Sequence, residues 1–298
     1  MSSGQYYTEK DAFFVNSSES IKFEVLHYPP ANIISNNPPI LFIHGLSLAA
    51  WIWDNFCHWF SYKGHDCYAM SFRGHGQSTK TPKKDKWWSV NDITNDVSAV
   101  TDAIIARTGD KPVLVGHSIG GGIVQNYLKN NQQKVAGGVL FASFSPYIYK
   151  TSAFKYTRKM FSNTPILAIL KALFTLNPYA LIGTPELMKR FSFSKAFPDS
   201  MAKDIHPKLK KVSFITVWNE LLKPFVEPSK IKCPMIVIGA EEDKLFDLKI
   251  IKETAEAYGV GFDIIGGAAH NIMLDLTWED AASVTFNRIQ EKVVNKEL

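Results

Sequence analysis

Cysteine is scarce in this chain of 298 residues, which contains only Cys57, Cys67 and Cys233. Three thiols are an odd number and lie far apart along the sequence, so they do not suggest a disulfide framework or a zinc site. All three lie next to apolar segments, which favours buried free thiols in a reducing compartment. We therefore expect no metal site, and no other sequence feature requires a cofactor.

Long apolar runs are also missing, because no stretch reaches the roughly 18 consecutive apolar residues that a membrane-spanning helix needs. The first ten residues, Met1 to Lys10, place no charged head before an apolar run, so they do not match a secretion signal. These two absences make a cytoplasmic location the expectation. The 46% hydrophobic content is enough for one large core, and no internal repeat divides the chain.

The most specific motif present is Gly116-His117-Ser118-Ile119-Gly120. It follows the apolar run 112–115 and precedes 121–128, which is typical of the start of a helix. A serine on so sharp a turn has strained backbone angles and needs glycines on both sides, because strand and helix approach closely there. The pattern predicts a nucleophile elbow that presents the Ser118 hydroxyl to substrate, with His117 packed behind it. A purely structural Gly/Ser turn is the alternative.

A serine hydroxyl needs a base within hydrogen-bond reach and an acid that holds this base in the correct tautomer. The predicted acid is Asp243, in a polar loop that follows the apolar strand 235–238. Glu241 and Glu242 in the same loop are the alternatives, unless they are simply solvated carboxylates.

The predicted base is His270. It follows a short apolar strand, 264–265, through the small residues 266–269, which leave room for its imidazole to swing over the elbow. Parallel strands end at one carboxyl edge of a sheet, so the strands before Ser118, Asp243 and His270 would bring the three side chains together.

At this point the chain resembles the α/β-hydrolase superfamily over nearly its whole length. Residues 40–47, Ile-Leu-Phe-Ile-His-Gly-Leu-Ser, are similar to the strand and His-Gly signature before the superfamily's oxyanion loop. The resemblance implies that the backbone amides of Leu46 and Ile119 form the oxyanion hole. Residues 71–78 look like the superfamily's Arg-Gly-x-Gly-x-Ser loop, except that Ser71 stands where an Asp is usual.

Apolar strands alternate with helical segments, which predicts an α/β fold with a mainly parallel central sheet flanked by helices on both faces. An amphipathic helix is expected over 90–108, beginning near a capping Asn91, and further elements are expected over 12–15, 21–28, 51–60, 67–72, 135–144 and 278–291. The alternation stops at 146–230, where prolines break short helical segments. The resemblance implies a helical cap inserted after the sixth core strand, with 1–145 and 231–298 as the hydrolase core.

The cap segment, residues 146–230, carries 14 Lys and Arg against 5 Asp and Glu, or +9, whereas the rest has 19 against 23, or −4. It is also rich in large apolar side chains. The plain interpretation is that these side chains pack the cap onto the core while the lysines face water. The alternative is that the cap forms an apolar pocket for an acyl or aromatic group. Its basic face would then bind an anionic phospholipid membrane surface, which would add a peripheral membrane location, or a phosphate-bearing thioester carrier. No nucleic-acid recognition motif accompanies the charge, so nucleic acid is not an expected partner.

These patterns predict a serine hydrolase that cleaves a small hydrophobic ester, lactone or acyl thioester, with Ser118 as nucleophile and His270 as base. An acyltransferase, a perhydrolase or a carbon-carbon bond hydrolase would use the same residues, and a non-catalytic receptor could share the scaffold. The predicted walls of the substrate pocket are large apolar residues near the motifs: Trp51, Phe144, Trp218, Leu245, Phe246 and Met273.

Overall fold

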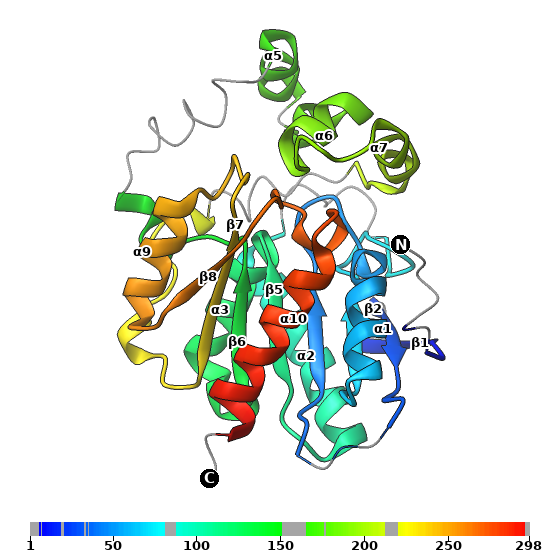
Figure 1. The fold of residues 1–298 in the computed structure, drawn as a ribbon, viewed down its shortest axis with the longest axis vertical. Coiled ribbons are helices and arrows are strands. Elements are labelled where there is room, and N and C mark those ends of the chain that lie inside the picture. The colour runs from blue at the N-terminus through cyan, green and yellow to red at the C-terminus, as the bar shows by residue number, and fades with distance from the viewer. Residues whose placement is uncertain are drawn as a thin grey trace.

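The computed structural model describes residues 6, 8–18, 21–32, 34, 36–80, 88–150, 165–175, 177–211 and 220–295. Within them an eight-stranded sheet has the order β1-β2-β4-β3-β5-β6-β7-β8 (Figure 1). The strands are β1 Asp11–Ser18, β2 Ile21–Tyr28, β3 Ile40–Ile43, β4 Cys67–Met70, β5 Val113–His117, β6 Gly137–Phe141, β7 Met235–Ala240 and β8 Phe262–Ile265. Strand β2 is antiparallel to both neighbours and the other pairs are parallel, which confirms the predicted mainly parallel sheet.

Helices cover both faces of this sheet, because successive strand residues point to opposite sides. Leu41 and Ile43 of β3 belong to a core shared with α2, α3 and α9, whereas Ile40 and Phe42 belong to a second core shared with α1 and α10. The helices of the described residues are α1 Asp54–Tyr62, α2 Val90–Thr108, α3 Ile119–Asn131, α5 Ile166–Thr175, α6 Pro185–Ser192, α7 Asp199–Ile205, α9 Leu248–Tyr258 and α10 Trp278–Ile289. Strands β3 to β7 are buried along their whole length, as strands of a doubly covered parallel sheet must be.

Several predicted element ends differ from the structure, and two details have clear local reasons, the N-cap of α2 and the end of β6. Helix α2 is capped by Ser89 rather than near Asn91: the Ser89 hydroxyl accepts the Asp92 N–H, and the Asp92 carboxylate accepts the Ser89 N–H. The strand expected over 135–144 ends at Phe141, because Ala142 has a φ of 45° and turns the chain out of the sheet.

Ser71 stands where the resembled superfamily usually has Asp, and it forms a hydrogen bond with a carboxylate from another strand. Its hydroxyl donates to Glu24 Oε2 of β2 at 2.6 Å and accepts the Ala50 N–H at 3.0 Å. The same Glu24 oxygen accepts the Gln77 N–H at 3.1 Å. A buried glutamate 47 positions earlier therefore fixes the loop that begins at Ser71.

The connection between β6 and β7 contains α5, α6 and α7, which stand beyond the carboxyl edge of the sheet (Figure 1). The Asn271 N–H donates to the Ser192 carbonyl at 2.8 Å, so α6 contacts the loop that carries His270. Apolar side chains from this connection also join the core beneath α1 and α10: Met188, Phe193, Phe197, Ala202 and Ile205. We retain 146–230 as the proposed cap segment.

Candidate active site

Ser118 lies between β5 and α3 with φ 54° and ψ −120°, angles that few residues other than glycine adopt. Its N–H donates to the Phe141 carbonyl at 3.0 Å, and its own carbonyl accepts the Ser143 hydroxyl at 2.9 Å. A Cβ on Gly116 would lie 2.6 Å from the Gly120 carbonyl oxygen, so the close approach of strand and helix requires glycine there. Hydrogen bonds from β6 and from the residues just after it thus hold the strained turn.

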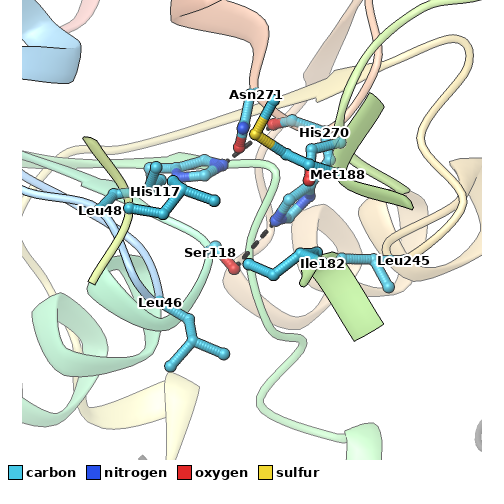
Figure 2. A pocket seen from close by; sticks show the side chains of 11 residues that line it. Leu46, Leu48, His117, Ser118, Ile182, Met188, Leu245, His270 and Asn271 are labelled. Atoms are coloured by element: carbon cyan, nitrogen blue, oxygen red, sulfur yellow. Dashed lines mark hydrogen bonds between the residues drawn. The ribbon is translucent and has the colours of Figure 1, made fainter. Parts of the chain in front are cut away.

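Three side chains that are far apart in the sequence form one continuous hydrogen-bonded chain. Ser118 Oγ lies 3.1 Å from His270 Nε2 (Figure 2), and His270 Nδ1 lies 2.9 Å from Asp243 Oδ2. All three residues are buried. Because Nδ1 faces a carboxylate, a neutral imidazole carries its proton there and leaves Nε2 to accept the serine hydroxyl. This is the arrangement that a general base for Ser118 requires.

Asp243 is held firmly in place by its own loop. Its Oδ1 accepts the N–H groups of Leu245 at 2.7 Å and Phe246 at 3.0 Å, which leaves Oδ2 for His270. The carboxylate is completely buried, so its hydrogen bonds are not exchanged with water. An acid held in this way fixes both the tautomer and the orientation of the imidazole.

The two alternatives for the acid contact other groups. Glu241 accepts the Gly267 N–H at 2.9 Å, and Glu242 accepts the Lys195 N–H at 3.0 Å. Glu241 therefore steadies the loop before His270, and Glu242 ties the cap segment to the loop after β7. Among these three consecutive acids, only Asp243 contacts the imidazole.

His117 has a larger place in the site than the sequence indicated. Its Nε2–H donates to the His270 backbone carbonyl at 3.0 Å, and the two ring centroids are 4.7 Å apart (Figure 2). The residue also lines the cavity described below. Burial, with the nearby His270 as a further cause, lowers the pKa of His117 well below its usual value. A neutral His117 therefore supports the His270 loop without placing a second positive charge beside it.

The turn after β3 approaches the elbow from the opposite side. His44 Nδ1–H donates to the Gly45 carbonyl at 2.7 Å, and its Nε2 accepts the Phe72 N–H at 3.0 Å. Burial lowers the pKa of His44 well below the ordinary value, which keeps Nε2 available as an acceptor. Ser47 then adopts a φ of 62°, so the chain reverses directly after Leu46. His44 thus acts here as a spacer between two loops.

Leu46 and Ile119 are the residues whose amides the resemblance assigns to the oxyanion hole. Leu46 lines the cavity, and Ile119 is the first residue of α3, where helical N–H groups have no partner within the helix. Within the described residues, neither amide donates a hydrogen bond. Two such donors in residues next to the cavity suit a developing negative charge, and the N-terminus of α3 adds a favourable dipole.

A cavity opens beside Ser118 and His270 (Figure 2). The volume within which the centre of a water molecule can move is about 70 Å³, so the cavity can hold several water molecules. Core and cap segment both contribute to its lining: Leu46, Leu48, His117, Ser118, Ile182, Met188, Ser192, Leu209, Leu245, His270 and Asn271. None of these lining residues is an Asp, Glu, Lys or Arg, so the cavity offers a substrate mainly apolar contacts.

Of the predicted pocket walls, Leu245 lines this cavity. Phe144, Phe246 and Met273 do not, because they are completely buried in the two apolar cores. The rings of Phe144 and Phe246 pack 4.8 Å apart, and the Phe246 ring lies 5.6 Å from that of His270. These aromatic residues are close to the motifs in sequence, but they pack in the apolar core next to the site and do not line the cavity.

Trp51 is also absent from the lining; its half-buried ring packs under the Lys208 ammonium, 5.2 Å from the centroid. Trp218 lies outside the described residues. The cap side of the cavity is instead built by Ile182, Met188 and Leu209, which the sequence analysis did not single out. They are three apolar residues among many in the cap segment, and no local pattern distinguishes them.

Among the residues that the structure describes, no group of three or more His, Cys, Asp or Glu side chains is placed to hold a metal ion. No described helix has both the length and the apolar composition needed to cross a membrane.

A comparison with protein families matches residues 36–277 to the model of the serine aminopeptidase family, S33. The match includes the elbow, the loop of Asp243 and the loop of His270, and it covers well over half of the chain. The chain belongs to this family. With its eight-stranded sheet, this S33 family member is an α/β-hydrolase, as the sequence motifs predicted.

Two curated proteins are similar to part of the S33 family member. The non-heme chloroperoxidase of Burkholderia pyrrocinia is 34% identical over 118 residues, which are 39% of this chain and 40% of that protein. The non-heme chloroperoxidase of Streptomyces lividans is 33% identical over 114 residues, 38% and 39% of the respective chains. The match therefore spans about two fifths of the length of these relatives.

Solved structures of similar fold cover almost the whole chain. A membrane phospholipase A described as a bacterial virulence factor has a TM-score of 0.69 at 17% identity, over 97% of this chain and 87% of that one. An esterase from Thermogutta terrifontis has 0.67 at 14%, over 95% and 99%. An esterase from Exiguobacterium antarcticum has 0.69 at 15%, over 94% and 100%. At such low identities the likeness shows the fold alone.

Proposed function

We propose that this S33 family member is a serine hydrolase that cleaves an ester, lactone or thioester of a hydrophobic acid through an acyl-enzyme on Ser118. The observation that carries the proposal is the hydrogen-bonded chain from Ser118 through His270 to Asp243, which ends in an apolar cavity. The esterases among the structurally similar proteins agree with this chemistry.

In the first half of the reaction His270 Nε2 takes the Ser118 proton as Oγ attacks the substrate carbonyl carbon. The carbonyl π electrons move onto oxygen, and the amides of Leu46 and Ile119 stabilise this oxyanion by roughly 3 to 4 kcal/mol each. Asp243 stabilises the imidazolium form of His270. When the tetrahedral intermediate collapses, the bond to the leaving group breaks, His270 protonates that group, and the acyl-enzyme remains.

In the second half the same groups act on water. His270 removes a proton from a water molecule, whose oxygen attacks the acyl carbon and forms a second oxyanion between the same two amides. Collapse breaks the bond to Ser118 Oγ, and His270 returns the proton to the serine. His117 stays neutral throughout, so no neighbouring cation opposes the imidazolium state.

The composition of the cavity favours an ester-type substrate over a free peptide. An aminopeptidase must bind the α-ammonium group of its substrate close to the nucleophile, and a buried cation of this kind needs a carboxylate partner. The cavity lining of the described residues contains no Asp or Glu. An uncharged apolar acyl group meets no such cost.

The proposal is tested with a fluorophosphonate probe and a panel of nitrophenyl esters, lactones, acyl thioesters and amino-acid anilides. We expect the probe to label Ser118, and esters or thioesters to be cleaved much faster than anilides. Ser118→Ala should lose labelling and at least about 10⁴-fold in kcat, with an unchanged thermal unfolding midpoint. Labelling that persists in Ser118→Ala, or faster cleavage of anilides, would contradict the proposal.

Perhydrolysis is a second candidate, favoured by the partial match to the two proteins named non-heme chloroperoxidases. Here hydrogen peroxide replaces water: a peroxide oxygen attacks the acyl carbon, His270 accepts the peroxide proton and returns it to Ser118 Oγ, and a peroxy acid leaves. Incubation with an ester and hydrogen peroxide, followed by a peroxy acid assay, separates the two candidates. Ester cleavage with no peroxy acid formed would exclude perhydrolysis.

A further inference from the structure

Helix α5 presents a row of large apolar side chains to solvent. Ile166, Leu167, Leu170 and Phe174 are 71%, 76%, 55% and 92% exposed. At 3.6 residues per turn these four positions fall within an arc of about 100° on one side of the helix. Ala168, on the opposite side, is buried. The protein therefore buries the small residue and exposes the large ones, the reverse of what folding alone would favour, and such patches mark interaction sites.

The segment that contains this exposed face carries mainly positive charge. Lys171 lies on α5 at the border of the apolar arc and is exposed, and α5 contains no acidic residue. The cap segment to which α5 belongs has a net charge of +9, against −4 for the rest of the chain. Exposed lysines continue along its described part: Lys195, Lys203, Lys208 and Lys211. An apolar helical face with basic surroundings is the pattern of a helix that lies in the surface of an anionic membrane.

We propose that the face of α5 formed by Ile166, Leu167, Leu170 and Phe174 inserts into the surface of an anionic phospholipid membrane. Two other occupants fit less well. A second copy of the chain would bring two positively charged segments together. A phosphate-bearing carrier would satisfy the lysines but leave Phe174 and Leu167 in water, whereas a bilayer supplies both negative charge and hydrocarbon.

The position of α5 also links membrane docking to substrate supply. This link rests on the proposed function, whereas the docking itself does not. Helices α5 and α6 lie at the same end of the molecule (Figure 1), and α6 supplies Met188 and Ser192 to the cavity. A membrane in contact with α5 thus faces the end of the molecule where the cavity lies. Hydrophobic esters are concentrated in the bilayer, so docking brings the cap side of the site to its substrate.

The test is sedimentation of the full chain with vesicles of phosphatidylcholine, with or without phosphatidylserine. The wild type should bind the phosphatidylserine vesicles more strongly, and high salt should weaken this binding. The double variant Leu167→Ser/Phe174→Ser should lose affinity by roughly a hundredfold, because two side chains no longer leave water. Phe14→Ser, which removes a 46% exposed phenylalanine from β1, is the matched control and should bind as the wild type does.

Four results would each overturn the proposal: no binding to either vesicle, equal binding to both, wild-type binding by the double variant, or a dimer in solution that the double variant loses in the absence of vesicle binding. Binding that inorganic phosphate abolishes equally in wild type and double variant would indicate a phosphate site and also contradict insertion. Unfolding midpoints should be unchanged in all variants, since the altered side chains are exposed. Cleavage of a water-soluble short ester, measured in parallel, distinguishes failure of docking from failure of the proposed function.

Discussion

The core loops and the cap segment enclose one cavity by different physical means. On the core side, buried hydrogen bonds define each group: Asp243 Oδ1 holds two amides, and Ser118 is kept in a strained conformation by Phe141 and Ser143. On the cap side, the walls are the side chains of Ile182, Met188, Ser192 and Leu209, of which all but Ser192 are apolar. Directional bonds position reacting atoms, whereas apolar contacts set only shape and volume. From this comparison we expect the chemistry to depend on the core, and substrate choice to depend largely on the cap segment.

One buried carboxylate, that of Asp275, joins the two regions. Its Oδ2 accepts the N–H groups of Ser194 at 2.8 Å and Ala269 at 3.0 Å. Its Oδ1 accepts the Ser194 hydroxyl at 2.7 Å and the Leu276 N–H at 2.8 Å. One side chain therefore ties the cap segment to the loop that carries His270.

Asp275→Ala is the variant from which we expect the largest effect, because it removes a link between the core and the cap segment. Four donors, three of them in buried hydrogen bonds, lose a charged acceptor. The free energy of unfolding should therefore fall by about 3 to 5 kcal/mol, and ester cleavage should fall as the His270 loop loosens. Urea unfolding and steady-state kinetics measure the two effects. Asp102→Ala is the control, because its pair with Lys134 is exposed and should contribute less than about 1 kcal/mol. A loss of similar size in both variants would refute the special role of Asp275.

Acid is expected to destabilise the core through its buried histidines. His44, His65, His75 and His117 are buried in the core, and burial lowers the pKa of each, to about 4 for His65 and His75. Below about pH 6.5 the unfolded chain binds protons at these sites while the folded protein does not. Stability should therefore fall as the pH decreases from about 6.5 towards 4, by up to about 1.4 kcal/mol per pH unit for each histidine.

This pH dependence is checked on a single residue with His65→Gln. Between about pH 6.5 and 5 the variant should lose roughly 2 kcal/mol less than the wild type, because one buried histidine no longer titrates in the unfolded chain. Urea unfolding at several pH values gives the slopes. Identical slopes in variant and wild type would show that His65 does not contribute.

The smallest expected effect sharpens the assignment of substrate choice to the cap segment. Ile182→Ala removes three carbons from the cavity wall, so kcat/KM for longer acyl chains should rise relative to short ones by about tenfold. The kcat for the shortest ester should change little, because the hydrogen bonds of Ser118, His270 and Asp243 are untouched. Ile34→Ala is the control, because Ile34 lies outside the cap segment and the cavity and is 51% exposed. An unchanged chain-length profile would place substrate choice elsewhere.

Several expectations from the sequence were met because they depend on local geometry. The elbow at Ser118 needs glycines within two residues of the serine, and the structure shows the close approach that requires them at Gly116. Helix α2 was predicted with its observed bounds, because its apolar period and the following Gly109, with φ 80°, are both local signals. The predicted helix N-cap near Asn91 was wrong, because the N-cap residue is Ser89. Ser89 and Asp92 form a reciprocal pair of hydrogen bonds.

Other features required the tertiary structure. The sequence analysis favoured Asp243 as the acid but left Glu241 and Glu242 open as alternatives. The structure shows that Asp243, held by the amides of Leu245 and Phe246, contacts His270. The identity of the pocket walls also required the tertiary structure. Phe144 and Phe246 are as apolar as the residues that line the cavity, but they pack in the core instead.

The sequence by itself determined the order of strands and helices and the position of the strained serine, because backbone conformation and hydrophobic period act between near neighbours. Only the tertiary structure separated Asp243 from its alternatives Glu241 and Glu242, placed the Glu24 carboxylate against the Ser71 hydroxyl, and exposed the large side chains of α5. The physical reason is that these outcomes depend on hydrogen bonds and burial between segments tens of residues apart, which no single segment encodes.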